Sequence, residues 1–163
     1  MTSTQPLIRK FLYFCLALAM GATAALSYAG ESITINNPWV RATHPGQNIS
    51  AGYMTITSAH DATLIMIESD VTKSVEIHSM KMENNVMKMR MLTSLALTAG
   101  KPYKLEPPSY HLMLFDLKKP LLDSQIVNFE LTFKNSKNVE FKQKISAIVK
   151  DANSASQSNH SNH

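Results

Sequence analysis

The sequence predicts an all-β domain, a β-sandwich or barrel with Greek-key connections. Between Ile33 and Lys150, apolar and polar residues alternate in runs of roughly five to eight, which is the pattern of half-buried strands. Turn-forming residues separate these runs along the whole region. After residue 30, no stretch keeps the 3.6-residue period of an amphipathic helix over three turns. Together these observations favour layers of strands packed around one core.

The candidate strands follow one another with short connections. They span residues 39–41, 52–57, 63–68, 74–80, 86–92, 110–114, 126–133 and 139–149. The turns between them, rich in Asn, Pro, Gly or Ser, include residues 36–38, 44–46, 83–85, 107–109 and 135–138. No internal repeat is present, so the 163 residues predict a single domain.

Residues 1–29 have the pattern of a secretory signal peptide. Arg9 and Lys10 precede an apolar run over residues 11–26, and Ser27 and Ala29 supply the small residues of a cleavage site. The run is shorter than the roughly 20 apolar residues that span a bilayer, and bulky residues precede Cys15 where a lipoprotein signal needs small ones. We therefore expect an exported chain without stable membrane insertion after processing. It would comprise a β domain over residues 30–150 and a disordered polar tail over residues 151–163.

Processing changes both the charge and the cysteine content. The formal charge falls from +4 to +2, because Arg9 and Lys10 are removed and no acidic residue goes with them. A charge of this size gives no reason to expect binding to nucleic acid or to an anionic membrane. Cys15, the single cysteine, also lies in the removed segment, which excludes thiolate metal sites and thiol catalysis from the mature protein.

Methionine is unusually concentrated in one part of the chain. Of ten methionines, six lie between Met80 and Met113. Methionine often fills irregular gaps in a core, so each one taken alone is most simply a packing residue. The triplet His111-Leu112-Met113 favours a function, because residues i and i+2 of a strand project from the same face. An imidazole and a thioether side by side form half of a metal site.

The preceding hairpin supplies further donors. Glu76, His78, Met80 and Met82 alternate along one strand face, and Asn84-Asn85 predicts the turn. The returning strand carries three methionines on one face, which the turn brings opposite His78: Met87, Met89 and Met91. Strand parity does not choose among these three.

The softness of these donors selects the metal. Thioethers favour Cu(I) over zinc, calcium or magnesium, and imidazole also binds copper. A blue-copper electron-transfer centre needs a cysteine thiolate, which the mature chain lacks. Two imidazoles and two thioethers are uncharged, so we expect a bound Cu(I) to keep its positive charge without a built-in counter-anion.

These residues resemble the periplasmic PCu(A)C-type copper chaperones, whose signature is a histidine, ten residues, a methionine, twenty-one residues and then histidine-x-methionine. His78, Met89, His111 and Met113 fit this spacing without gaps, and the likeness extends over residues 33–149, including the segments 37–42, 51–54, 75–78 and 110–114. The resemblance implies a cupredoxin-like fold, a periplasmic location and these four residues as the copper ligands. The choice of Met89 rests on the resemblance alone. One departure is the Pro107-Pro108-Ser109 segment, where a glycine-bearing turn would be expected.

The resemblance also implies a non-enzymatic task, namely delivery of Cu(I) to subunit II of cytochrome c oxidase or to a related haem-copper oxidase, often together with Sco-type thiol proteins. The sequence contains no catalytic triad, paired-carboxylate site or phosphate loop that would predict an enzyme. Two alternatives remain open: a copper-dependent redox protein, and a generic periplasmic copper-buffering or interaction module.

The other histidines, methionines and neighbouring polar or aromatic residues lie outside the predicted ligand set. Met80 and Met82 would line or shield the site, and the roles of Met87 and Met91 stay open. We interpret His44 and His60 as loop residues, Trp39 as a core aromatic, and Arg41 and Glu76 as either an ion pair or solvated side chains. The tail residues His160 and His163 could capture Cu(II), although a solvated tail without a metal role explains them equally well.

Overall fold

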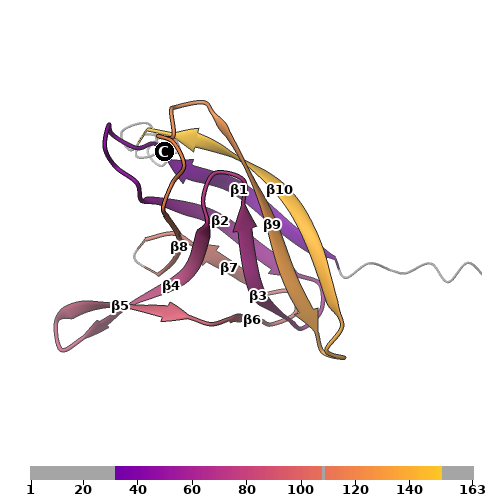
Figure 1. Cartoon of the computed structure of the whole chain (residues 1–163). Helices are drawn as coiled ribbons and strands as arrows, with labels where there is room; N and C mark the ends of the chain where they lie inside the picture. Colours follow the sequence, from indigo (N-terminus) through magenta and orange to yellow (C-terminus); the bar gives the residue numbers. More distant parts are fainter. Residues whose placement is uncertain (1–31, 108, 152–163) are drawn as a thin grey trace, which may run out of the picture. The chain divides into compact units, whose positions relative to one another are not determined.

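The structure is a computed structural model that describes residues 32–107 and 109–151. The strands in these residues form one strongly curved sheet that nearly closes into a barrel (Figure 1). They are β1 (Ile33–Arg41), β2 (Ser50–Ser58), β3 (Ala62–Ser69), β4 (Ser74–Glu83), β5 (Val86–Leu92), β6 (Leu95–Leu97), β7 (Pro102–Leu105), β8 (Tyr110–Phe115), β9 (Ile126–Asn135) and β10 (Glu140–Lys150). The predicted all-β, single-domain fold is confirmed.

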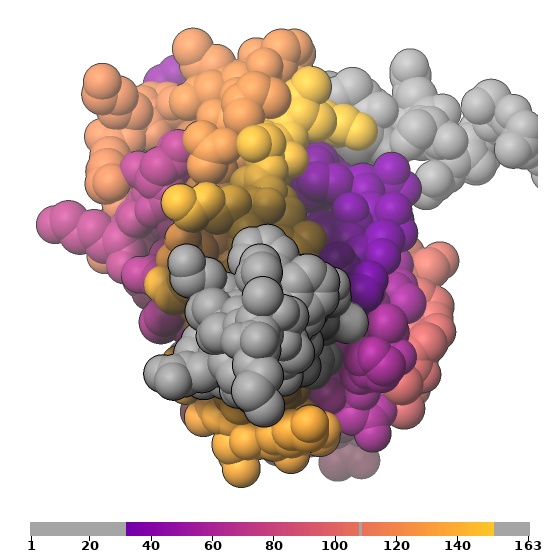
Figure 2. All heavy atoms as spheres, turned by 90° about the vertical axis from the view of Figure 1, so that its right-hand side faces the viewer, coloured from indigo at the N-terminus to yellow at the C-terminus, as the bar shows by residue number. Residues whose placement is uncertain are grey.

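Neighbouring strands in the sheet come from distant parts of the chain. The order is β5-β4-β8-β2-β1-β10-β9-β3-β6, and β7 pairs with β2 off this path. β1 and β10 run parallel, with Trp39 opposite Ile148, and the other pairings within the described residues are antiparallel. Figure 2 shows β1 (indigo) beside β10 (yellow). This topology inserts β8 between β4 and β2.

The interior of the sheet is filled by the apolar half of each alternating run. On β8, Leu112 and Leu114 are fully buried, while His111 and Met113 occupy the opposite face. The largest fully buried side chains come from most of the strands: Phe129, Phe133, Ile56, Leu64, Leu97, Leu105, Leu112, Leu114, Leu121, Leu131, Val40 and Val127. Burial of this apolar surface is the main force that holds the domain together, at about 25 cal/mol per Å².

Two details differ from the sequence prediction. The segment 36–38, expected to be a turn, lies inside β1, which begins at Ile33. Its register against β2 shifts between Asn36 and Trp39, and Asn37 has a φ of 49°, so these residues form a bulge rather than a chain reversal. β6 and β7, with three and four residues, were not predicted, because such short strands carry too little alternation.

The β4–β5 hairpin extends away from the barrel, at the left of Figure 1. Glu83 pairs with Val86 across a two-residue loop. Asn84 and Asn85 have φ values of 53° and 60°, as the predicted tight turn requires, and asparagine tolerates this left-handed conformation well. The turn therefore fixes the register of every pair along the hairpin.

The predictions for the two ends of the chain lie outside the described residues. They concern the signal peptide over residues 1–29 and the tail over residues 151–163, of which only Asp151 is described. Within the described residues, no helix has the length and apolar character needed to cross a membrane.

Candidate metal site

The two predicted histidine ligands lie directly opposite each other. His78 of β4 pairs with His111 of β8, so the two imidazoles project from the same face of the sheet. Their ring centroids are 5.7 Å apart, with an angle of 44° between the ring planes. His111 is buried, with 5% of its surface exposed. The residues that were 33 positions apart in sequence therefore meet on one rung of the sheet.

Met113 lies on the same face, two residues further along β8. It pairs with Glu76 of β4 on one side and with Ala51 of β2 on the other. Its neighbour on β8, Leu112, points into the fully buried core. The core thus anchors the strand, and the predicted donors His111 and Met113 are held on the outer face at a fixed spacing.

The returning strand β5 brings three methionines to this face. Met91 pairs with His78, Met89 with Met80, and Met87 with Met82. Met91 is therefore directly opposite His78, whereas Met89 lies one rung further toward the turn, on a diagonal. Both are about half exposed, at 57% for Met91 and 52% for Met89.

The three candidate methionines on β5 differ in whether they line a groove of about 300 Å³. Of the three methionines, Met89 lines this groove, together with His111 and Met113. His78 does not line it, and its ring packs beside that of His111. The remaining lining residues are Arg41, Gln47, Ile49, Ser50, Ala51, Tyr53, Met80 and Pro107. Three of the four predicted ligands thus share one concave surface, and the fourth adjoins it.

The hydrogen-bonding state of His78 determines which ring atom is available. Its Nε2 lies 2.8 Å from Oε2 of Glu76. A carboxylate accepts hydrogen bonds and cannot donate them, so Nε2 carries the proton and donates to Glu76. In the neutral ring, Nδ1 then keeps its lone pair, and this atom is buried without a hydrogen-bond partner in the described structure. Metal-binding histidines commonly have this arrangement, with the other ring nitrogen donating to a carboxylate.

Burial favours the neutral form of the His111 ring, which is the form that can bind a metal ion. Its Nδ1 is also buried and has no hydrogen-bond partner among the described residues. Burial lowers the pKa of His111 below its usual value of 6.5, because the imidazolium would lose its hydration, and the nearby His78 lowers it further. His111 therefore remains neutral at pH 7, and a neutral ring is the form that binds metal.

The contacts of Glu76 differ from those that the sequence led us to expect. We expected no built-in anion at the site, but the Glu76 carboxylate accepts a hydrogen bond from the His78 ring. Nor does Glu76 pair with Arg41, whose Nη2 donates to the Tyr53 hydroxyl at 3.1 Å. The centroids of the Tyr53 and Trp39 rings are 4.3 Å apart, and Tyr53 lines the groove. Trp39 therefore lies beside the groove, and it is partly exposed rather than part of the core. This aromatic rim had no signature in the sequence.

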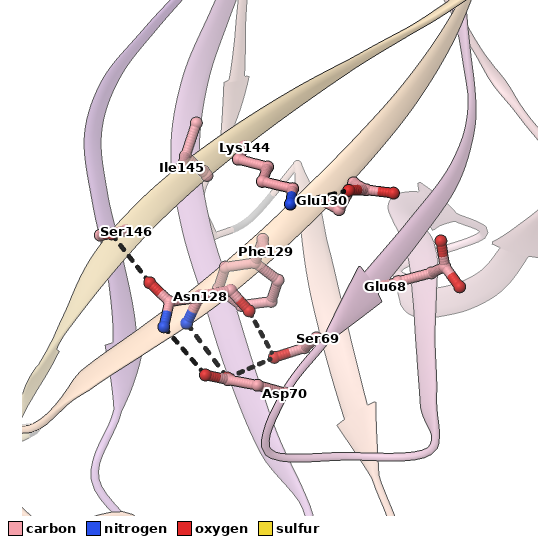
Figure 3. Close-up of a pocket in the computed structure, with 9 residues that line it drawn as sticks. All are labelled: Glu68, Ser69, Asp70, Asn128, Phe129, Glu130, Lys144, Ile145 and Ser146. Atoms are coloured by element: carbon pink, nitrogen blue, oxygen red, sulfur yellow. Dashed lines mark hydrogen bonds and ion pairs between the residues drawn. The ribbon is translucent and has the colours of Figure 1, made fainter.

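A second cavity, of about 610 Å³, lies elsewhere, between β3, β9 and β10 (Figure 3). Its polar groups are satisfied by one another. Asp70 accepts from the backbone N–H of Asn128 at 3.1 Å and from its side chain at 2.9 Å, and Ser146 donates to Asn128 at 2.9 Å. The Glu130 carboxylate accepts from Lys142, which lowers the pKa of Glu130. These polar groups of the cavity are thus hydrogen-bonded or ion-paired within the described residues.

Other predicted donors lie apart from the groove. His44 and His60 do not line it, and both occupy loops, as expected. His160 and His163 lie outside the described residues. Among residues 32–107 and 109–151, no group of three His, Cys, Asp or Glu side chains could hold a metal ion by itself. A metal site at the groove therefore requires the thioethers.

Comparison with known proteins identifies the family. Residues 33–145 match the model described as "Putative lipoprotein LpqE-like", and the chain belongs to this LpqE-like family. The curated relative "Putative lipoprotein Lxx21020" of Leifsonia xyli subsp. xyli (strain CTCB07) is 26% identical over 104 residues. Those residues make up 63% of this chain and 63% of the relative, so the chain spans less than two thirds of that protein's length.

Solved structures confirm the expected likeness to the PCu(A)C fold. The copper-bound PCuAC domain from PmoF2 has a TM-score of 0.59 and 24% identity, over 76% of this chain and 97% of that one. The Cu(I) form of DR1885 from Deinococcus radiodurans has a TM-score of 0.51 and 25% identity, over 81% of this chain and 85% of that one. The chain is thus similar in fold to domains whose structures were solved with copper bound.

Proposed function

We propose that this member of the LpqE-like family is an exported copper carrier that binds one Cu(I) through His78, Met89, His111 and Met113. The observation that supports this most directly is the pair of imidazoles that face each other on one rung. Each has an Nδ1 without a hydrogen-bond partner in the described structure. A buried, unsatisfied polar atom costs about 1–3 kcal/mol, so such a pair is explained by a function that uses the two ring nitrogens.

The donor set is suited to Cu(I). Two neutral imidazoles and two thioethers form a soft, uncharged set, and thioethers discriminate against the hard cations and zinc. The Glu76 carboxylate would balance the charge of the ion through the His78 ring, without coordinating it. Imidazoles also accept Cu(II), so binding of Cu(II) is a secondary possibility that the same titrations can examine.

Metal transfer needs an accessible ligand, and the groove offers one. Met89 is 52% exposed, whereas His111 is 5% exposed, so the ion would be held between a rigid, buried side and a mobile, open side. An acceptor thiolate could displace Met89 first and the remaining ligands afterwards. Because the copper stays in its +1 state, this stepwise exchange needs no redox partner.

The resemblance to the PCu(A)C proteins supports a specific destination for the copper. We propose that the acceptor is subunit II of cytochrome c oxidase or a related haem-copper oxidase, with a Sco-type thiol protein as a second partner. The titles of two similar structures name bound copper, in PmoF2 and in DR1885. The groove carries ligands and an aromatic rim without a paired acid and base, which favours a carrier over an enzyme.

The location follows from the predicted export signal and from the family. We propose a periplasmic protein processed after Ala29, although the family and the Leifsonia relative are both described as lipoproteins. A lipid-anchored form would require acylation of Cys15, the single cysteine. Intact mass of the protein purified from its host membrane and periplasmic fractions distinguishes the two forms, because an acylated chain would begin at Cys15.

Native mass spectrometry with Cu(I), under anaerobic conditions, tests the site. We expect alanine variants of His78, Met89, His111 and Met113 each to lose most of the copper bound in the groove. Met91→Ala is the matched control, because Met91 has the same side chain, lies on the same strand face and has similar exposure, but does not line the groove. Retention of copper by all four variants, or equal loss in the control, would contradict the proposal.

A further inference from the structure

The β4–β5 hairpin has one face built of methionine side chains. Three cross-strand rungs carry them: Met91 opposite His78, Met89 opposite Met80, and Met87 opposite Met82. Met82 is 62% exposed and Met87 is 38% exposed, and of the three methionine-bearing rungs theirs is the nearest to the turn. Large apolar side chains are usually withdrawn from water, and this hairpin stands away from the barrel (Figure 1). Filling of the core therefore does not account for these two residues.

The opposite face of the same hairpin is charged. Lys81 pairs with Lys88, and Glu83 forms ion pairs with Lys88 at 3.1 Å and with Arg90 at 3.0 Å. Over the outer part of the hairpin, residues 79–90, the charged side chains and the thioethers thus lie on opposite faces. A hairpin that needed only to remain soluble would gain from polar residues on both faces, so the thioether face calls for a ligand.

The geometry of the outer rungs allows several sulfur atoms to meet. Directly paired residues have Cβ atoms about 4.5–5.5 Å apart, and a methionine side chain has three rotatable bonds with which to adjust its sulfur. Met82 and Met87 form one such pair, and Met80 adjoins Met82 on the same face of β4. Three thioethers can therefore surround one ion at the tip of the hairpin.

We propose that Met80, Met82 and Met87 form a second Cu(I) site, separate from the groove. Thioethers alone bind monovalent soft ions and discriminate against zinc, calcium and magnesium. The site has no carboxylate equivalent to Glu76 on its own face, and the reverse face carries Lys81, Lys88 and Arg90 against Glu83. This positive surplus opposes a cation, so the tip binds Cu(I) more weakly than the groove and exchanges it readily.

Met80 connects the two sites. It lines the groove together with Met89 and His111, and it also belongs to the tip set. An ion captured at the tip can move inward by exchanging Met82 and Met87 for Met89 and His111 while it remains Cu(I). Binding at the tip stands independently, whereas this inward transfer rests on the proposed function of the groove.

Anaerobic Cu(I) titration with native mass spectrometry, applied to the full processed chain, tests the second site. We expect the wild-type protein to bind two Cu(I) ions and Met82→Leu/Met87→Leu to bind one, because leucine keeps the apolar volume and removes the sulfur. Met66→Leu is the matched control: Met66 is an exposed methionine on β3, at 44% exposure, and its replacement should leave two ions bound.

A complementary variant separates failure at the tip from failure at the groove. His111→Ala/Met113→Ala should retain one Cu(I), with a copper K-edge absorption spectrum fitted by sulfur ligands alone. A wild-type stoichiometry of one, or a second ion that persists in Met82→Leu/Met87→Leu, would overturn the tip site. A first ion unaffected by His111→Ala/Met113→Ala would instead overturn the groove and leave the tip proposal standing.

Discussion

The groove beside β8 and the polar cavity between β3, β9 and β10 differ in how their polar groups are satisfied. The cavity is the larger, at about 610 Å³ against about 300 Å³. In the cavity, Asp70, Asn128 and Ser146 hydrogen-bond one another (Figure 3). In the groove region, His78 and His111 each keep a buried Nδ1 without a partner. Unpartnered ring nitrogens, rather than cavity volume, therefore point to the groove as the binding site.

Replacing His111 should weaken Cu(I) binding strongly while leaving the free energy of unfolding unchanged or higher. Its effect on Cu(I) affinity should be the largest of those predicted here. We expect His111→Phe to weaken Cu(I) binding by more than the roughly 10–100-fold typical of losing an outer partner, because a ligand itself is removed. Stability should stay equal or rise, since an apolar ring replaces a desolvated imidazole in a buried position. Chelator competition measures the first quantity and urea unfolding of the copper-free protein the second. Strong destabilisation would indicate that His111 serves the fold instead.

Removing the negative charge of Glu76, which accepts a hydrogen bond from His78, should give a smaller loss of Cu(I) affinity. In Glu76→Gln the amide oxygen can still accept from Nε2, but it no longer offers a negative charge to the ion. We expect Cu(I) affinity to fall about 10–100-fold, in the range seen for outer partners of metal ligands. Glu68→Gln at the polar cavity is the control, since Glu68 is an exposed carboxylate that contacts Lys142. Equal affinities in both variants would show that Glu76 has no part in binding.

The strand pattern accounts for most of what the sequence could predict. Alternation located the longer strands because most of them have one buried and one exposed face, and the asparagine pair identified the hairpin turn. The bulge at Asn37 was mistaken for a turn because asparagine and proline favour both. Parity also placed His111 and Met113 on one face of their strand, whereas the meeting of His78 with His111 depends on the β4–β8 register.

Parity could not predict the features that depend on how strands pack. Met87, Met89 and Met91 share a face, so only the position of the groove distinguishes Met89 from the others. The Glu76–His78 contact and the Arg41–Tyr53 rim depend on rotamers and on the β1–β2 pairing, respectively. Neither leaves a periodic signal in the sequence.

The free energy of unfolding should depend on pH through the titration of His111 in the groove. The pKa of His111 in the folded protein is below 6.5, whereas the unfolded chain titrates near 6.5. Between these values the unfolded chain binds a proton that the folded chain excludes. The stabilising effect of the neutral ring is therefore complete above about pH 6.5 and is lost as the pH falls through the folded pKa. Urea unfolding of the copper-free protein at several pH values measures this slope, which should be reduced in His111→Phe.

Cu(I) affinity should follow the same titration. Because protons compete for the ring nitrogens, affinity should fall by up to about tenfold per pH unit once the pH is below the pKa of His111. The onset should lie at lower pH than for a free imidazole, since burial already disfavours the protonated ring. An affinity that stays flat as the pH falls from 7.5 to well below the folded pKa of His111, measured by chelator competition, would exclude ligation by His111.

The smallest effect is expected at the polar cavity, where Asp70→Ala tests the other half of the comparison. The side chain of Asp70 accepts from the backbone N–H and the side chain of Asn128, and water can hydrate both donors in the variant because the two contacts are exposed. We expect a loss of about 1 kcal/mol in the free energy of unfolding, since exchange with water leaves only the net value of the hydrogen bonds. Cu(I) affinity should remain unchanged, because the variant alters no residue of the groove. A change in affinity would mean that the two regions are coupled through the sheet, and the contrast between a structural network and a binding groove would then have to be given up.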